Sequence, residues 1–335
     1  MFSDNFNIFH KNSILLGRTN VNCFIFVWKI GILTNPALTK AIAILLIGLA
    51  AFDLMSVIVR TLGEVFPILQ ISVIRNFFGV IPALILLLMG PGVTTLKTIK
   101  AAVHWKVIVI RSASILVAQM AFYTALTKLE FATAATLCFT SPFFVTLLSI
   151  PLLGHKIGYI RFSAIFVGFF GVATIFKPFD DNFTFWMFLP VLAGFGYGLS
   201  SVLVKLVPNE VPSATIQIAQ QLVTFLLGAC FLIVQGDFVP IVSLSDLFYF
   251  VLMGFCGGLG VLCFIISYRL VDPSSLSVFE YFGIPISFAM GWFFFNEAPI
   301  STLFPGALLL LGAGILIIFR ERKLSPLDQK NSSKC

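Results

Sequence analysis

Four charged side chains stand inside long apolar stretches of the sequence, where a charge needs a partner or water. Asp53 and Arg75 lie near the middles of the first two stretches. Arg111 lies about six residues into the third stretch, and Glu280 lies at a similar depth in the ninth. A charge at the centre of a membrane helix costs about 2.5–3.5 kcal/mol on insertion scales. We therefore expect these residues to bind a ligand or to carry a proton.

Each of these charges also has a structural explanation. Asp53 and Arg75 lie on helices joined by a short turn, so they could meet as an ion pair that either binds a ligand or only fixes helix packing. The long stem of Arg111 could carry its charge to the membrane surface. Glu280 could pair with a cation near the same surface, such as Arg269 or Lys205. The sequence leaves these alternatives open.

Uncharged polar side chains in the apolar stretches are further candidates. Gln217, Gln220 and Gln221 recur at i, i+3 and i+4, so they share one face of a helix. That face either lines a ligand site or holds helices together through hydrogen bonds. Gln119 and Tyr123 share a face in the same way. The other candidates for substrate contact are Ser141, Tyr197, Tyr268 and Tyr281, and the polar residues Ser200 and Ser201 lie on the same predicted helix as Tyr197.

Two prolines are expected to interrupt helices near these candidates. Pro142 leaves the carbonyl of Cys138 without its helical donor, and Pro285 does the same for Tyr281. Broken helices at matching positions in two halves of a chain are typical of transporter binding sites. Proline kinks also occur in ordinary membrane helices, so the breaks alone do not assign a function.

The elements that carry these residues are long hydrophobic segments. Of 335 residues, 59% are hydrophobic and only 10% are charged, and the mean hydropathy is +1.04. A soluble domain carries about 25% charged residues, whereas about 20 consecutive apolar residues span a bilayer. The sequence therefore predicts an all-α integral membrane protein with ten transmembrane helices. These lie at about residues 39–60, 66–90, 105–126, 130–153, 158–177, 184–206, 212–235, 245–268, 275–295 and 300–319.

The basic residues predict the direction of the helices. If the N-terminus is cytoplasmic, 16 of the 21 Lys and Arg residues fall in cytoplasmic segments and three fall outside. Such an excess marks the cytoplasmic side of a membrane protein. We therefore expect both termini in the cytoplasm. The net charge of +7 is explained by topology, and no nucleic-acid partner is expected.

The sequence also matches itself at an offset of 145 residues. Leu54–Gly63 matches Leu199–Pro208, and the same offset relates Tyr123 to Tyr268. Five helices in each half is an odd number, so the halves should insert in opposite directions as an inverted repeat. Inverted repeats are typical of transporters that expose a central site to each side in turn. Such a repeat could also be the relic of a duplication in an enzyme or a scaffold.

The repeat predicts the domain organisation and an asymmetric site. Asp53 and Arg75 have no charged counterparts in the second half. The expected units are an N-terminal cytoplasmic extension at 1–38, a first repeat at 39–177, a second repeat at 184–319 and a cytoplasmic tail at 320–335.

Two pairs of segments carry a resemblance to a known family. The first pair is Phe131–Phe144 and Leu152–Lys156, and the second pair is Phe279–Gly283 and Gly291–Glu297. With these segments the chain resembles the drug/metabolite transporter superfamily, in its EamA-like branch, over about residues 38–322. The resemblance is to bacterial members, which include carriers of S-adenosylmethionine and riboflavin, and it implies a bacterial inner membrane.

The resemblance has consequences for two carboxylates. It implies that the segment containing Glu280 opens a helix that lines the central cavity. The family usually has Gly-Glu where the first half of this chain has Gly154 and His155, whereas Glu297 keeps the acid in the second half. This departure weakens a shared role for the two positions and leaves the expected fold unaffected.

The expected function is a secondary transporter that moves a small polar or zwitterionic metabolite by alternating access. Its expected partners are this small molecule and membrane lipid, with proton coupling through Asp53 or Glu280 and a monomeric or dimeric state. No cofactor or metal is expected, and an enzyme is disfavoured because the three histidines show no metal-ligand spacing. A channel-like or scaffolding membrane protein is the alternative.

Overall fold

A computed structural model of the chain describes residues 36–89, 105–154, 174, 184–271 and 276–297. All regular structure in these ranges is helical. In the first half the helices are α2 (Pro36–Leu62), α3 (Ile68–Phe78), α4 (Ile81–Met89), α5 (Trp105–Lys128), α6 (Phe131–Cys138) and α7 (Ser141–Leu153). In the second half they are η2 (Phe185–Met187), α9 (Phe188–Leu203), η3 (Val204–Leu206), α10 (Ser213–Gln235), α11 (Leu244–Leu270), η4 (Ser277–Phe282) and α13 (Gly283–Phe295).

Seven helical segments of the described part are long and apolar enough to cross a membrane. They coincide with the first four and the sixth to eighth of the ten predicted segments. The ninth is represented by a shorter apolar helix, Phe279–Phe295. The fifth and tenth predictions, at 158–177 and 300–319, lie outside the described residues apart from Thr174. The all-helical class is confirmed here, and the number ten stays a prediction.

Several segments are broken helices. The fourth is divided at Phe139 and Thr140 into α6 and α7, next to Pro142. The ninth changes at Gly283 from the 3₁₀ helix η4 to α13. The second was expected to be continuous, but it is divided at Gly79 and Val80 into α3 and α4. Pro82 explains this break, because it cannot donate to the carbonyl four residues earlier.

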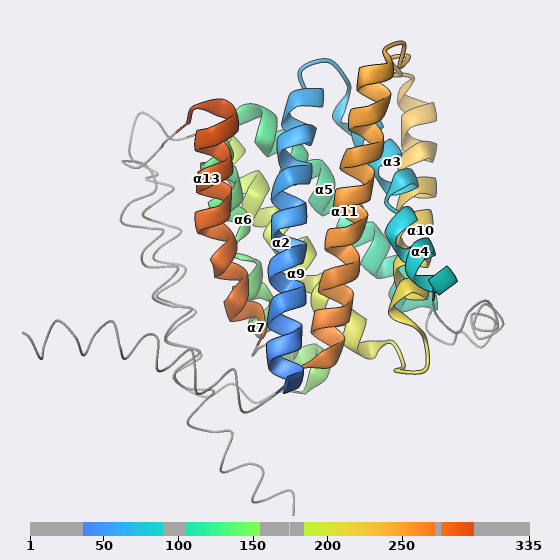
Figure 1. The fold of residues 1–335 in the computed structure, drawn as a ribbon, viewed down its shortest axis with the longest axis vertical. Helices are drawn as coiled ribbons and strands as arrows, with labels where there is room; N and C mark the ends of the chain where they lie inside the picture. Colours follow the sequence, from blue (N-terminus) through green and yellow to red (C-terminus); the bar gives the residue numbers. More distant parts are fainter. Residues whose placement is uncertain (1–35, 90–104, 155–173, 175–183, 272–275, 298–335) are drawn as a thin grey trace, which may run out of the picture. The chain divides into compact units, whose positions relative to one another are not determined.

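The helices pack as one unit from Ala41 onward, and they run side by side in Figure 1. Glycines set the closest approaches. A side chain at Gly196 of α9 would lie 2.8 Å from Ala118 of α5, and one at Gly198 would lie 2.9 Å from Phe144 of α7. On the other side, a side chain at Gly48 of α2 would lie 2.9 Å from Cys263 of α11. Small residues let membrane helices approach closely in this way.

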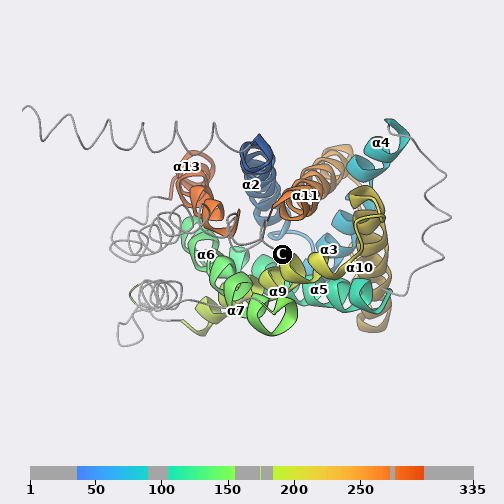
Figure 2. The same cartoon turned by 90° about the horizontal axis from the view of Figure 1, so that it is seen from below.

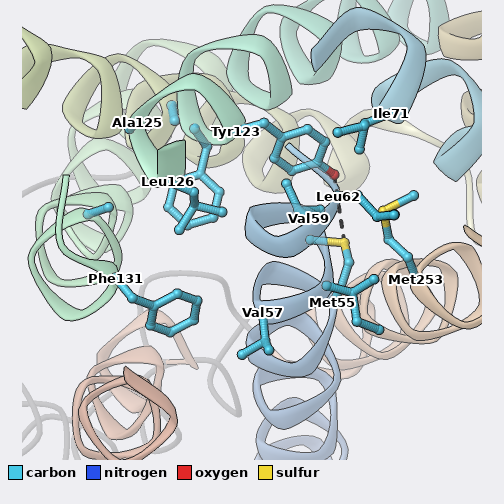
Figure 3. Close-up of a cluster of buried hydrophobic side chains, with 14 of the residues drawn as sticks. Met55, Val57, Val59, Leu62, Ile71, Tyr123, Ala125, Leu126, Phe131 and Met253 are labelled. Carbon is cyan, nitrogen blue, oxygen red and sulfur yellow. Dashed lines mark hydrogen bonds between the residues drawn. The ribbon is translucent and has the colours of Figure 1, made fainter. Parts of the chain in front are cut away.

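A cluster of buried apolar side chains joins α2, α3, α5, α6 and α11 at one end of the helices (Figure 3). It contains Met55, Val57, Ile58, Val59 and Leu62 of α2, Ile71 near the start of α3, the end of α5, and Phe131 at the start of α6. Because α2 and α5 end here while α3, α6 and α11 begin here, we name this the Arg60 end of the bundle. The side chains of the cluster form an apolar layer there.

Candidate functional site

A cavity of about 140 Å³ lies among α2, α3, α5, α6, α7, α9, α11 and η4. Figure 2 views these helices along their length, with α2 and α11 facing α5 and α9. The cavity is comparable in size to the roughly 150 Å³ void that admits a benzene molecule in an engineered core. Eight of the thirteen predicted contact residues line it: Asp53, Arg75, Arg111, Gln119, Tyr123, Ser141, Tyr197 and Glu280.

Arg75 of α3 is almost fully buried at 1% exposure. Its Nη1 donates to two neutral amide oxygens, at 3.0 Å to Asn76 Oδ1 and 3.1 Å to Gln221 Oε1. Its Nε is buried without a hydrogen-bond partner. Asn76 is itself fixed by Gln119, because Asn76 Nδ2 donates to Gln119 Oε1 at 2.8 Å. The guanidinium is therefore oriented by amides, and no carboxylate of the described ranges pairs with its charge.

Gly257 of α11 provides the space beside this guanidinium. A side chain at this position would place its Cβ 2.5 Å from Arg75 Nε and 2.7 Å from Nη2. The same Cβ would lie 2.6 Å from Met55 Sδ. Glycine at this position therefore leaves the guanidinium in its observed place, and a larger residue would displace it.

Arg111 of α5 is buried at 4% exposure rather than extended to the membrane surface. Its Nε donates to the carbonyl of Ser200 on α9 at 3.0 Å, and its Nη1 is buried without a partner. The snorkelling alternative is wrong for this conformation, because the close α5–α9 contact holds the side chain between the helices. The cavity therefore has a second guanidinium with an unpaired N–H.

Asp53 of α2 accepts a hydrogen bond from Ser287 Oγ of α13 at 2.7 Å, and its Oδ2 is buried without a partner. The ion pair that Asp53 and Arg75 could have formed is not present, and within the described residues the hydrogen-bond partners of both side chains are neutral. This alternative does not hold, because packing, rather than the short turn between the helices, sets the direction of each side chain.

Glu280 of η4 accepts a hydrogen bond from Tyr268 of α11, and Ser141 of α7 also hydrogen-bonds its carboxylate. The alternative partner Arg269 is used elsewhere. Its guanidinium donates to the carbonyls of Val211 at 2.6 Å and Pro208 at 2.8 Å, in the turn before α10. Among the described residues, Glu280 therefore has only neutral hydrogen-bond partners.

Five predicted residues do not line the cavity. Tyr268 lies outside the cavity lining and hydrogen-bonds Glu280, which lines the cavity. Gln221 likewise accepts a hydrogen bond from the cavity residue Arg75. Gln217 Nε2 donates to the carbonyls of Gly79 at 3.1 Å and Gly258 at 2.7 Å, so it joins α10 to the break after α3 and to α11. The two others, Gln220 and Tyr281, have buried side-chain atoms without partners.

The cavity also contains Phe52, Met55, Ser56 and Cys138, which were not predicted as contacts, and the internal repeat could have identified them. Met55 and Ser56 of α2 correspond at the 145-residue offset to Ser200 and Ser201 of α9, and all four line the cavity. Phe52 corresponds to Tyr197 in the same way. At the offset of 142 found further along the chain, Cys138 corresponds to Glu280, and both line the cavity.

Known proteins resemble the chain over most of its length. The EamA-like transporter family matches residues 39–177 and 184–320. A riboflavin transporter of Brucella anthropi is 27% identical over 256 residues, which cover 75% of this chain and 89% of that protein. An S-adenosylmethionine uptake transporter of Rickettsia bellii is 24% identical over 278 residues, covering 83% and 92%.

A solved crystal structure shares the fold. It is 18% identical, has a TM-score of 0.65, and covers 84% of this chain and 98% of the matched chain. Together with seven apolar helices in the described part, these likenesses establish a multi-pass membrane protein and confirm the resemblance found in the sequence. The chain belongs to the EamA-like transporter family of the drug/metabolite transporter superfamily.

Proposed function

We propose that the chain is a secondary transporter that carries a small polar or zwitterionic metabolite across the bacterial inner membrane by alternating access. One observation carries the proposal. Asp53, Arg75, Arg111 and Glu280 all line one cavity, and no two of them form an ion pair. Buried charges normally require partners. A ligand with its own charged groups would provide them.

The arrangement assigns a part of the ligand to each charge. Arg75 and Arg111 would receive an acidic group, because a guanidinium offers several donors in a plane that suits carboxylate or phosphate. Asp53 and Glu280 would receive a cationic group. A ligand with one group of each sign balances the two positive and two negative side chains. Aromatic lining from Phe52, Tyr123 and other rings suits an apolar or planar part of the ligand.

The size of the cavity supports movement during transport. Riboflavin and S-adenosylmethionine, named for two relatives, are both larger than the single ring that a cavity of about 140 Å³ admits. To bind a compound of this size, the helices around the cavity would have to separate. An inverted repeat allows this by rocking one group of helices against another.

The first test is thermal stability of the purified chain with S-adenosylmethionine, riboflavin and amino acids. A ligand at 100 times its Kd stabilises the folded state by about 2.7 kcal/mol, which raises Tm. Arg75→Gln and Arg111→Gln should abolish this shift and keep the basal fold. The matched control is Lys106→Gln, which removes an exposed cation from the same helix as Arg111. If no compound in these classes shifts Tm, the proposed substrate class is wrong.

Uptake into liposomes then separates a carrier from a channel. A carrier shows saturation and countertransport, whereas a channel shows flux without either. The same assay tests proton coupling through Asp53 and Glu280, which is proposed because both carboxylates line the cavity. The double variant Asp53→Asn, Glu280→Gln should lose uptake driven by a pH gradient. Full pH-driven uptake in that variant would exclude coupling at these two residues.

A further inference from the structure

An ion pair lies at the Arg60 end of the bundle, outside the cavity. Arg60, in the last turn of α2, donates from both terminal nitrogens to the carboxylate of Glu297, which follows α13. The Nη1–Oε2 distance is 2.8 Å. Glu297 Oε2 also accepts from the backbone N–H of Phe131 at the start of α6, at 2.8 Å. One carboxylate therefore connects the ends of three separate elements.

Aromatic rings support the same contact. The guanidinium of Arg60 lies 4.4 Å from the ring centroid of Phe295, the last residue of α13. Phe295 in turn packs against Phe131, with ring centroids 5.6 Å apart. Cation–π contacts of this kind add to an ion pair in a partly exposed site. We name the Arg60–Glu297 ion pair, together with the rings of Phe295 and Phe131, the latch.

The apolar layer lies between the cavity and the latch. Along α2 the last cavity residue is Ser56, and the buried apolar residues Val57, Ile58 and Val59 separate it from Arg60. From Ser56 to Arg60 the rise along the helix is about 6 Å at 1.5 Å per residue. Along α5 the cavity residues end at Tyr123, and Ala125 and Leu126 of the layer follow. A ligand leaving toward the Arg60 end would have to pass the layer and then the latch.

The repeat gives the opposite end different residues at the corresponding positions. Arg60 corresponds to Lys205 at the offset of 145, and Glu297 corresponds to His155 at the offset of 142. Lys205 Nζ donates to the carbonyl of Arg269 at 3.5 Å, and His155 lies outside the described residues. Two basic residue types cannot reproduce an arginine–carboxylate pair. The charge pattern of the latch is therefore specific to the Arg60 end.

We propose that Arg60 and Glu297 form the latch of an outer gate, which holds α2 against α6 and α13 and must break before the cavity opens to the outside. The charge distribution of the sequence places the Arg60 end on the outside. This inference rests on the proposed transport function, because only a carrier needs the cavity to open on this side. Neutralising either residue shifts the gate toward the open state.

The environment of the latch suits repeated breaking and closing. Each of its two charged side chains keeps 20% of its surface exposed. Water can therefore replace the pair's hydrogen bonds as they break, which a fully buried pair would not allow. The apolar layer beneath the latch contains no charged side chains. The Arg60–Glu297 pair is therefore the contact at this end whose geometry depends on direction.

The test measures access to the cavity and needs no substrate. Ser56 lines the cavity and donates only to the carbonyl of its own helix at Phe52, so Ser56→Cys is a conservative reporter in a chain whose six cysteines are replaced. Intact cells are treated with a membrane-impermeant maleimide, and the labelling rate is measured. Glu297→Gln and Arg60→Gln should each raise the rate about fivefold or more, a shift within the usual range of conformational coupling.

Two controls complete the experiment. The exchange Arg60→Glu, Glu297→Arg should return the rate toward that of the native latch, since it rebuilds a pair of opposite charges. Glu64→Gln removes an exposed acid just beyond α2 and should leave the rate unchanged. Melting temperatures of all variants identify loss of fold.

The outcomes separate the gate from the transport proposal. An unchanged rate in folded Glu297→Gln protein, or an equal increase in Glu64→Gln, overturns the latch. An increase seen only when the reagent is on the cytoplasmic side overturns the assignment to the outer gate. A latch-dependent rate in a chain that carries no compound in liposomes would keep the gate and reject the proposed function.

Discussion

The side chain of Arg75 is the residue on which the proposed chemistry depends most. It is held by the oxygens of Asn76 and Gln221, which are neutral, so these contacts fix its direction and leave its charge available. An arginine in an ordinary structural pair would instead meet a carboxylate. The unpaired Nε beside a cavity makes binding of an acidic ligand group the better explanation.

Gly257→Ala tests this placement without changing the arginine itself. The new Cβ would lie 2.5 Å from Arg75 Nε and 2.6 Å from Met55 Sδ, so the guanidinium must move. We expect a ligand that stabilises the native chain to bind about tenfold more weakly, equivalent to about 1.4 kcal/mol, as measured by thermal-shift titration. Gly291→Ala is the control, because its Cβ meets its nearest neighbours at an ordinary 3.6 Å. Equal affinity in both variants would contradict a ligand contact at Arg75.

At the scale of the elements, the breaks in the helices position the site. The interruption between α6 and α7 places Cys138 and Phe139 at the cavity, and the change from η4 to α13 places Glu280 there. The break at Gly79 has a different role. The carbonyl of Gly79 accepts a hydrogen bond from the side chain of Gln217, which also donates to the carbonyl of Gly258. Gln217 therefore holds α3, α10 and α11 together.

Replacing Gln217 tests that structural role. Gln217→Met keeps the length of the side chain and removes its donors, so two buried carbonyls lose a hydrogen bond. We expect a loss of about 1–3 kcal/mol in the free energy of unfolding, measured by denaturant unfolding in detergent. Gln235→Met, at the exposed end of the same helix, loses only a contact with Asp237 and should change stability little. Comparable losses of unfolding free energy in the two variants would exclude this structural role of Gln217.

The sequence predicts the helices better than the contacts between their side chains. The long apolar segments and the proline near the fourth-helix break were identified because hydropathy and proline act locally. The break at Gly79 has a similar local signal in Pro82, but Gly-Val-Ile-Pro is as apolar as its neighbours, so the second segment was predicted as one continuous span. The Asp53–Arg75 pair was predicted wrongly, and the Arg60–Glu297 pair was not predicted. Residues 237 positions apart meet only through packing of whole helices.

At the scale of the whole molecule, two-fold repetition explains how a small set of helices encloses the cavity. Phe52, Met55 and Ser56 on α2 have Tyr197, Ser200 and Ser201 at the corresponding positions of α9, and both sets face the cavity. The charges break this symmetry, since Asp53 corresponds to Gly198 and Arg75 to Gln220. The backbone frame is thus repeated while the polar contacts differ, which suits a ligand whose two ends differ.

The orientation of the halves is tested by reporter fusions. Ten helices with both termini in the cytoplasm place Lys156 inside, Asp180 outside, Ala298 outside and Ser325 inside. These four sites flank the fifth and tenth predicted helices, which lie outside the described residues apart from Thr174. Alkaline phosphatase fused after Asp180 or Ala298 should be active, because this enzyme folds only outside the cytoplasm. Green fluorescent protein fused after Lys156 or Ser325 should fluoresce.

The fusion after Asp180 is the decisive one of the four. Five helices before this point put the start of the second half outside, which makes the repeat inverted, whereas four helices would put it inside and make the halves parallel. In a parallel arrangement α2 and α9 would cross the membrane in the same direction. Arg60 and Lys205 would then share one side, and the latch would no longer be specific to one face. Phosphatase activity at Asp180 combined with fluorescence at Ser325 therefore supports the inverted repeat, and an inactive phosphatase at Asp180 with a fluorescent green fluorescent protein fused at the same site rejects it.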